Sequence, residues 1–280
     1  MQLVTWQMAF TSQDQKPDAI HDLRVAIRHV RNCLRVIGEI FPKRARRKVR
    51  RRLRAINKLA GRVRDTDIAA EVMATVLRIP DRPIFRRLRR ERKKAKRKLR
   101  KELRRWIRRK ELKEWHAELR FSSISRTKKA QEEHGQSAKK YAEEVLPGLA
   151  VEFFSRGGTL SAYSPPEALH KFRLHGKRLR DIIELFHPCY GNEIDLLLRA
   201  ILEIHRTLGE FNDLVTTRKM LTDRGFRESR PRLFVDLDAR IGEKVNHFLL
   251  IWNQNLADPE TQRRWCDYLK TRQWDSLSGE

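Results

Sequence analysis

The sequence contains few of the residues that make turns and few cysteines. Only 12 glycines and 10 prolines occur among 280 residues, which favours long helices over many short strands. The three cysteines, at positions 33, 189 and 266, lie far apart and form no CxxC pair. This spacing argues against a disulfide framework and against a cysteine metal site, and it favours a reducing compartment.

Long apolar runs are also missing. No stretch approaches the roughly 20 residues that a membrane span needs. The first ten residues, MQLVTWQMAF, have no basic segment before an apolar one, so we expect no signal peptide. The expected location is therefore the cytoplasm. Hydrophobic residues still make up 40% of the chain, which is enough for a folded core.

Acidic residues are outnumbered by basic ones. The chain has 63 Lys and Arg against 36 Asp and Glu, a formal net charge of +27. Residues 1–150 hold 43 basic and 17 acidic residues, and residues 82–110 alone hold 18 and two. Such a field attracts polyanions, but it does not select among DNA, RNA, anionic lipid and inorganic polyphosphate. We expect the 82–110 face to be solvated and to add general attraction.

The hydrophobic periodicity predicts helix nearly throughout, with no convincing alternating strand. Gly61 is expected to end one helix, with Asp65 or Asp67 capping the next. In the second half Asn212 or Asp213 is expected to start a new helix. The Gly157–Gly158 pair, followed by 164–166, is the best linker in the chain.

The chain contains an internal repeat. Residues 19–37, AIHDLRVAIRHVRNCLRVI, and residues 168–186, ALHKFRLHGKRLRDIIELF, share the pattern H-x2-R-x3-[RK]-x2-R at an offset of 149. LAGRVRDTD (59–67) matches TLGEFNDLV (207–215) at an offset of 148, which aligns Gly61 with Gly209 and Asp65 with Asp213. Two matches in the same order predict a duplicated helical unit.

On a helix, the basic positions of each copy fall within an arc of about 80° that borders the apolar face. This placement predicts the wall of a groove, because a solvated stripe usually lies opposite the core. Alternatively, the long Arg stems cover apolar surface or pair with acids on a neighbouring helix. The repulsion among packed like charges favours a bound polyanion. The first row contains His21, Arg24, Arg28, Arg31 and Arg35, and the second contains His170, Arg173, Lys177 and Arg180.

A second basic stripe follows the first row along the chain, at Arg47, Arg51, Arg54 and Lys58. It lies opposite the apolar positions of its helix, where an ordinary solvated face is expected. Two of its residues have basic counterparts in the second copy: Arg51 aligns with Arg199, and Lys58 aligns with Arg206. Asp65 and Asp213 are expected to cap helices or to hold Arg side chains in place.

These motifs resemble the CHAD family, the conserved-histidine α-helical domain. The resemblance covers nearly the whole chain and implies an all-α fold of two pseudo-symmetric bundles, about four long helices each, with a basic groove or channel between them. It implies one domain over 1–280, with repeats at about 17–155 and 164–280. It also implies binding of inorganic polyphosphate and association with polyphosphate granules. The chain departs from its own repeat at Gly176, which is expected to weaken packing, and at Asn212, which removes a charge.

The chemistry agrees with a phosphate polymer as ligand, since Arg binds phosphate bidentately and Lys as a point charge. We expect a non-enzymatic binding protein with no catalytic residue, cofactor or metal site, and with sulfate or phosphate ions also entering the basic groove. The alternatives are a basic helical protein that binds nucleic acid non-specifically, or an accessory subunit of a phosphoanhydride-processing enzyme. The candidate binding residues are His21, Arg24, Arg28, Arg31, Arg35, Arg51, Arg54, Lys58, His170, Arg173, Lys177, Arg180, Arg199 and Arg206.

Overall fold

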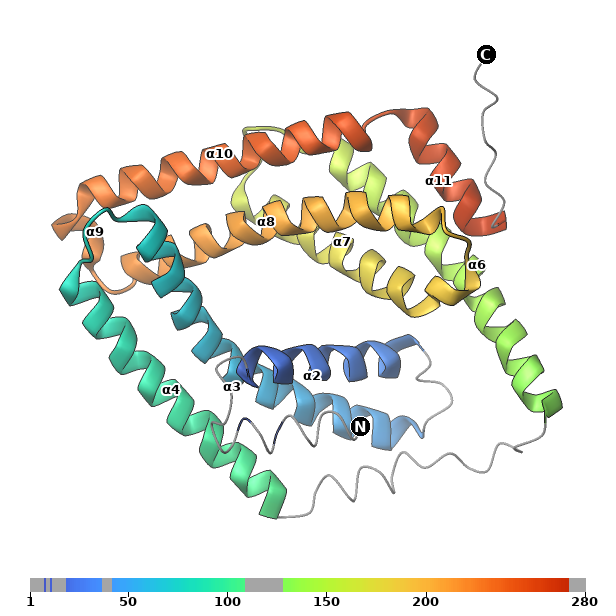
Figure 1. Cartoon of the computed structure of the whole chain (residues 1–280), viewed down its shortest axis with the longest axis horizontal. Helices are drawn as coiled ribbons and strands as arrows, with labels where there is room; N and C mark the ends of the chain where they lie inside the picture. Colours follow the sequence, from blue (N-terminus) through green and yellow to red (C-terminus); the bar gives the residue numbers. More distant parts are fainter. Residues whose placement is uncertain (1–7, 9–10, 12–18, 37–41, 109–127, 272–280) are drawn as a thin grey trace. The chain divides into compact units, whose positions relative to one another are not determined.

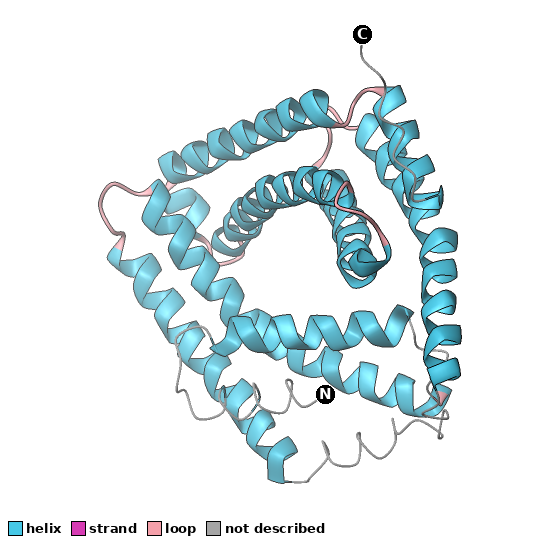
Figure 2. Cartoon of the chain, turned by 45° about the vertical axis from the view of Figure 1, so that its right-hand side comes forward, coloured by secondary structure: helices cyan, strands magenta, loops and turns pink. Residues whose placement is uncertain are grey.

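The computed structural model describes residues 8, 11, 19–36, 42–108 and 128–271, without the side chains of residues 33, 35, 36, 108 and 128–139. This part of the chain contains helices and no strand (Figure 2), which confirms the all-α class. The helices (Figure 1) are α2 (Ala19–Val36), α3 (Lys43–Val76), α4 (Arg82–Arg108), α6 (Lys128–Gly158), α7 (Pro166–Phe186), α8 (Ile194–Thr222), α9 (Phe226–Ser229), α10 (Pro231–Asn255) and α11 (Pro259–Thr271), with a 3-10 turn at His187–Cys189.

The chain forms two compact units, Met1–Ile124 and Ser125–Glu280. In the first unit α3 packs against both α2 and α4. In the second unit α6 packs against α7 and α11, and α8 packs against α7 and α10. The helix α6 therefore belongs to the second compact unit, whereas the sequence repeat assigns most of its residues to the first copy. The repeat boundaries themselves stay a prediction.

The core of the first unit is built from one apolar stripe on each of three helices. Apolar positions three or four residues apart bring these side chains to one face of each helix. Each fully buried aliphatic side chain contributes about 1.5–3 kcal/mol. The members of this core include Leu23 and Ile27 on α2, Val49, Leu53 and Ile56 on α3, and Leu99, Leu103 and Trp106 on α4.

Four aromatic rings form the centre of the second unit. Phe153 of α6 stacks on Phe172 of α7 with a centroid distance of 4.9 Å, and Trp252 of α10 meets Phe172 edge-on at 5.6 Å. Phe248 of α10 completes the group. The expectation that Gly176 weakens this packing is wrong, because a Cβ there would lie 3.0 Å from Phe153 Cε2. The ring occupies the space that the glycine leaves.

Three predicted helix boundaries are wrong. Gly61 lies inside α3, and Asn212 and Asp213 lie inside α8, so neither helix is interrupted at these positions. Glycine in a helix interior is about 1 kcal/mol less favourable than alanine, and tertiary contacts override this small penalty. Gly157 belongs to the last turn of α6, and a Cβ there would meet the Trp252 ring at 2.1 Å. It is a packing position and not a linker.

Candidate polyanion-binding site

In the first unit an arginine of α2 lies over the glycine of α3. A Cβ built at Gly61 would come within 2.9 Å of Arg24 Nη1. Burial lowers the pKa of Arg24, and the nearby Asp65 carboxylate opposes this shift. Burial likewise raises the pKa of Asp65, against the effect of Arg24. Desolvation outweighs the attraction within this pair, so the pair is held at a net electrostatic cost.

The second unit has the corresponding arrangement. Gly209 lies close to the Arg173 guanidinium, with a distance of 3.9 Å from its would-be Cβ to Nη2. Burial lowers the pKa of Arg173, and Asp213 again acts in the opposite direction. The buried Nε of Arg173 makes no hydrogen bond within the described residues. Both units therefore place an arginine beside a glycine, with an aspartate one turn further along the same helix.

Three cations of α7 surround a histidine of α8. Burial, together with the positive charges of Arg173, Arg180 and Lys177, lowers the pKa of His205 to about 3. The Asp181 carboxylate opposes them without reversing the shift. His205 is therefore neutral at pH 7. Nothing in the sequence marks His205 beyond its place one turn before Gly209.

Arg180 is largely buried, with 11% of its side chain exposed. Its Nη2 donates a hydrogen bond to Asp181 Oδ1 at 2.9 Å. Its Nε lies 3.4 Å from Glu184 Oε1, but this contact lacks hydrogen-bond geometry. Two carboxylates therefore hold Arg180 on its own helix, which agrees with the alternative interpretation for this one residue.

The two predicted histidines differ in their surroundings. Nδ1 of His170 lies 2.8 Å from Asn212 Oδ1, so Asn212 joins α8 to the start of α7. In the first unit the counterpart of Asn212 is Arg64, which forms an ion pair with Glu71 at 2.9 Å. His21 lies exposed in the first turn of α2. The departure at Asn212 thus removes a cation and adds a hydrogen-bond partner for His170.

The remaining predicted residues differ in exposure from helix to helix. Arg28 and Arg31 are partly buried on α2, whereas the side chain of Arg35 lies outside the described residues. The exposed members on the following helices are Arg51, Arg54 and Lys58 of α3 and Arg199 and Arg206 of α8. The structure thus brings the α7 cations together around His205 and leaves the α3 and α8 cations facing solvent.

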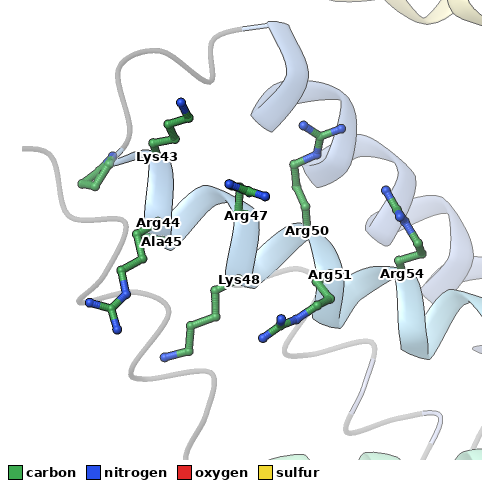
Figure 3. A pocket seen from close by; sticks show the side chains of 9 residues that line it. Lys43, Arg44, Ala45, Arg47, Lys48, Arg50, Arg51 and Arg54 are labelled. Carbon is green, nitrogen blue, oxygen red and sulfur yellow. The ribbon is translucent and has the colours of Figure 1, made fainter.

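A hollow of about 1440 Å³ adjoins the beginning of α3 (Figure 3). Apart from Pro42 and Ala45, the described residues that line it are all basic. Their side chains project from α3 in two rows (Figure 3). One row contains Lys43, Arg47, Arg50 and Arg54, and the other contains Arg44, Lys48 and Arg51. The sequence stripe missed Arg50 and combined residues from both rows.

The most basic helix, α4, buries an apolar stripe and exposes cations on its other faces. Arg87 and Arg105 are partnered within the helix, by Glu91 at 3.4 Å and by Glu102 at 3.8 Å. Arg92 forms an ion pair with Asp67, which lies inside α3 and is therefore not the predicted helix cap. Most other cations of this helix, including Arg86, are exposed.

The described residues contain neither a metal-ligand cluster nor a membrane-spanning helix. No group of three or more His, Cys, Asp or Glu side chains gathers among them in a way that could hold a metal ion. Nor does any helix in this part of the chain have the length and apolar character to cross a bilayer.

The described part of the chain is built from helices, and rows of cations lie beside its apolar helix faces. The family model of the CHAD domain matches residues 2–222, so the chain belongs to the CHAD domain family. The crystal structure of the CHAD domain from the plant Ricinus communis is similar in fold, with a TM-score of 0.58 and 17% identity over 95% of this chain and 86% of that chain. No curated protein matches the chain.

Proposed function

We propose that the protein binds inorganic polyphosphate through the basic rows of α2 and α7 and the helices packed beside them. Membership of the CHAD family supports this proposal. The observation that carries it is the state of Arg173. Its guanidinium is desolvated, its buried Nε has no acceptor within the described residues, and Lys177 and Arg180 lie with it around His205.

A bound anion relieves two unfavourable terms at this site. A phosphate oxygen offers an acceptor to the Arg173 Nε donor, and a buried donor without a partner costs about 1–3 kcal/mol. Its negative charge also opposes the mutual repulsion of the three α7 cations. Arg is suited to this task because its planar fork matches phosphate oxygens in pairs.

The ligand is proposed to be a polymer of phosphates without bases. The α7 aromatic residue closest to the row, Phe172, is buried in the core and stacked on Phe153. It offers no platform for a nucleobase, whereas single-stranded nucleic acid is usually held by stacking. Duplex nucleic acid shares the electrostatics of the proposal and is the competitor that the experiment must exclude.

The proposed role is binding without catalysis, with polyphosphate granules as the place where the protein acts. The described residues contain no group of three or more His, Cys, Asp or Glu side chains that could hold a metal ion, and phosphoanhydride chemistry commonly requires carboxylates to hold Mg²⁺. The protein then binds the polymer and thereby localises itself, or a partner chain, to the granule.

The test is calorimetric binding of long-chain polyphosphate, pyrophosphate and duplex DNA at one fixed salt concentration. Arg24→Gln and Arg173→Gln should each weaken long-chain binding at least about tenfold, since a charge-assisted contact contributes about 1.5–3 kcal/mol. Arg86→Gln on the exposed face of α4 is the matched control and should have little effect. Equal affinity for pyrophosphate and the long polymer, or tighter binding of DNA per charge, would overturn the proposal.

A further inference from the structure

The two units differ sharply in charge along the repeated helices, which are α2 and α3 in the first unit and α7 and α8 in the second. Residues 23–36 and 42–64 of the first unit hold 16 Lys or Arg and no Asp or Glu. The corresponding stretches of the second unit, 172–185 and 190–212, hold six basic and six acidic residues. The repeat therefore conserves the arginine–glycine–aspartate arrangement but not the charge around it.

The extra charge of the first unit continues the side of α3 that faces α2. Gly61 and Asp65 mark this side, because they lie beside Arg24. With Lys43 at zero on the helical wheel, Arg47, Arg50, Arg54, Gly61 and Asp65 all fall within an arc of about 60°. The row thus extends from the Arg24 contact to the hollow, over about 27 Å of helix.

The second unit has no basic residues at the positions that correspond to this row. The positions that correspond to Lys43, Arg47, Arg50 and Arg54 are Gly191, Asp195, Leu198 and Leu202. Asp195 is already engaged, with its Oδ1 2.8 Å from Nε2 of His187. An acid in the first turn is the ordinary arrangement for a helix, and α8 has it. Helix α3 has no acid in its first turn and no side-chain cap.

We propose that the hollow at the beginning of α3 is an additional phosphate subsite, which holds several consecutive phosphates of an oligophosphate and has no counterpart in the second unit. Arg47, Arg50 and Arg54 bind the phosphate oxygens, and Lys43 adds charge at the end of the row. The anion also meets the beginning of α3, where the partial positive charge of the helix favours it. This inference rests on the proposed function for the identity of the polymer.

The experiment uses the full chain and inorganic triphosphate as the probe. In one variant Arg47, Arg50 and Arg54 are replaced by Gln, and in the matched control the exposed α4 residues Arg86, Arg90 and Lys93 are replaced by Gln. Both variants lose three charges, so the general field is equal. Binding is measured by calorimetry, and hydrogen exchange follows the amides of residues 43–47.

Triphosphate should slow exchange at residues 43–47 of the wild-type chain. The α3 variant should lose this protection and bind triphosphate at least about tenfold more weakly, and the α4 control should change affinity less than about twofold. An Arg-to-Lys variant at the same three α3 positions should bind more weakly than wild type, because it keeps the charge but loses the forks. Circular dichroism should show equal helix content in all chains.

Equal losses in the two Gln variants, or unchanged exchange at residues 43–47, would overturn the subsite. The proposed function fails separately, if long-chain polyphosphate binding is unaffected by Arg24→Gln and Arg173→Gln. Protection of the α3 amides by triphosphate would in that case still establish the hollow as an anion site.

Discussion

Gly61 of α3 lies against the guanidinium of Arg24 of α2, so closely that a methyl group at position 61 would stand 2.9 Å from Arg24 Nη1. The second unit repeats the pair with more room, since the distance from Gly209 to Arg173 Nη2 is 3.9 Å. The same substitution in the two units therefore has different consequences.

Gly61→Ala should displace the Arg24 guanidinium and weaken polyphosphate binding. Gly209→Ala, the matched control, fits within ordinary contact distance and should leave binding unchanged. Both variants gain helix propensity of about 1 kcal/mol, so Gly209→Ala should raise the free energy of unfolding by about that amount. Calorimetric binding and urea denaturation of the two variants provide the measurement. Equal binding losses in both would contradict the role assigned to Arg24.

Replacing the Arg24–Asp65 pair by apolar residues should separate stability from binding. Desolvation dominates this pair, so the double variant Arg24→Met, Asp65→Leu should unfold with a free energy equal to wild type or higher by about 1 kcal/mol. Asp65→Leu alone should destabilise, because it leaves the Arg24 charge without its counter-charge. Both variants are compared by urea denaturation. A double variant that is less stable than Asp65→Leu would contradict this explanation.

His205 should give the fold a pH dependence in the acidic range. Its pKa in the folded state is about 3, below the 6.5 of an unperturbed histidine. Between these values the unfolded chain binds the proton more tightly, so stability falls as pH decreases from 6.5 to 3. The contribution of His205 has a slope of at most about 1.4 kcal/mol per pH unit. His205→Gln should remove that contribution.

The same histidine should report ligand binding. A polyanion near Arg173, Lys177 and Arg180 offsets the charges that depress the pKa of His205, so the pKa should rise when polyphosphate is added. Nuclear magnetic resonance titration of the imidazole, with and without polyphosphate, measures the shift. An imidazole that titrates near pH 6.5 in the free protein would show that the α7 cations do not act on it.

Gly157→Ala tests the packing of α6 against α10. The added methyl would overlap the Trp252 ring, with its nearest atom at 2.1 Å, and overpacking of this kind costs about 1–3 kcal/mol. Gly158→Ala is the neighbouring control, since nothing lies within 4 Å of its would-be Cβ. Thermal denaturation should place the first variant well below the second. Similar melting temperatures would mean that α10 adjusts without loss.

The helical class and the basic rows could be predicted from the sequence because both depend on local periodicity. The continuation of α3 through Gly61 and of α6 through Gly157 could not be predicted. A side chain from another helix, Arg24 or Trp252, occupies the space beside each glycine. His205 was missed for the same reason, since its surroundings come from α7 and not from its own helix. Arg50 was missed because a one-helix wheel does not show which side of α3 lies toward α2.

The exposed cations of α4 and the basic rows on α2 and α3 repel one another, and this repulsion lowers the stability of the folded first unit. Added salt screens repulsion between neighbouring like charges, so it stabilises this unit. The same salt displaces a bound polyanion. Rising ionic strength therefore increases the stability of the fold and decreases the affinity for the polymer. In dilute buffer the bound polymer, instead of salt, neutralises the cations. Polyphosphate should accordingly act as a folding aid for this protein under the conditions where the free chain is weakest.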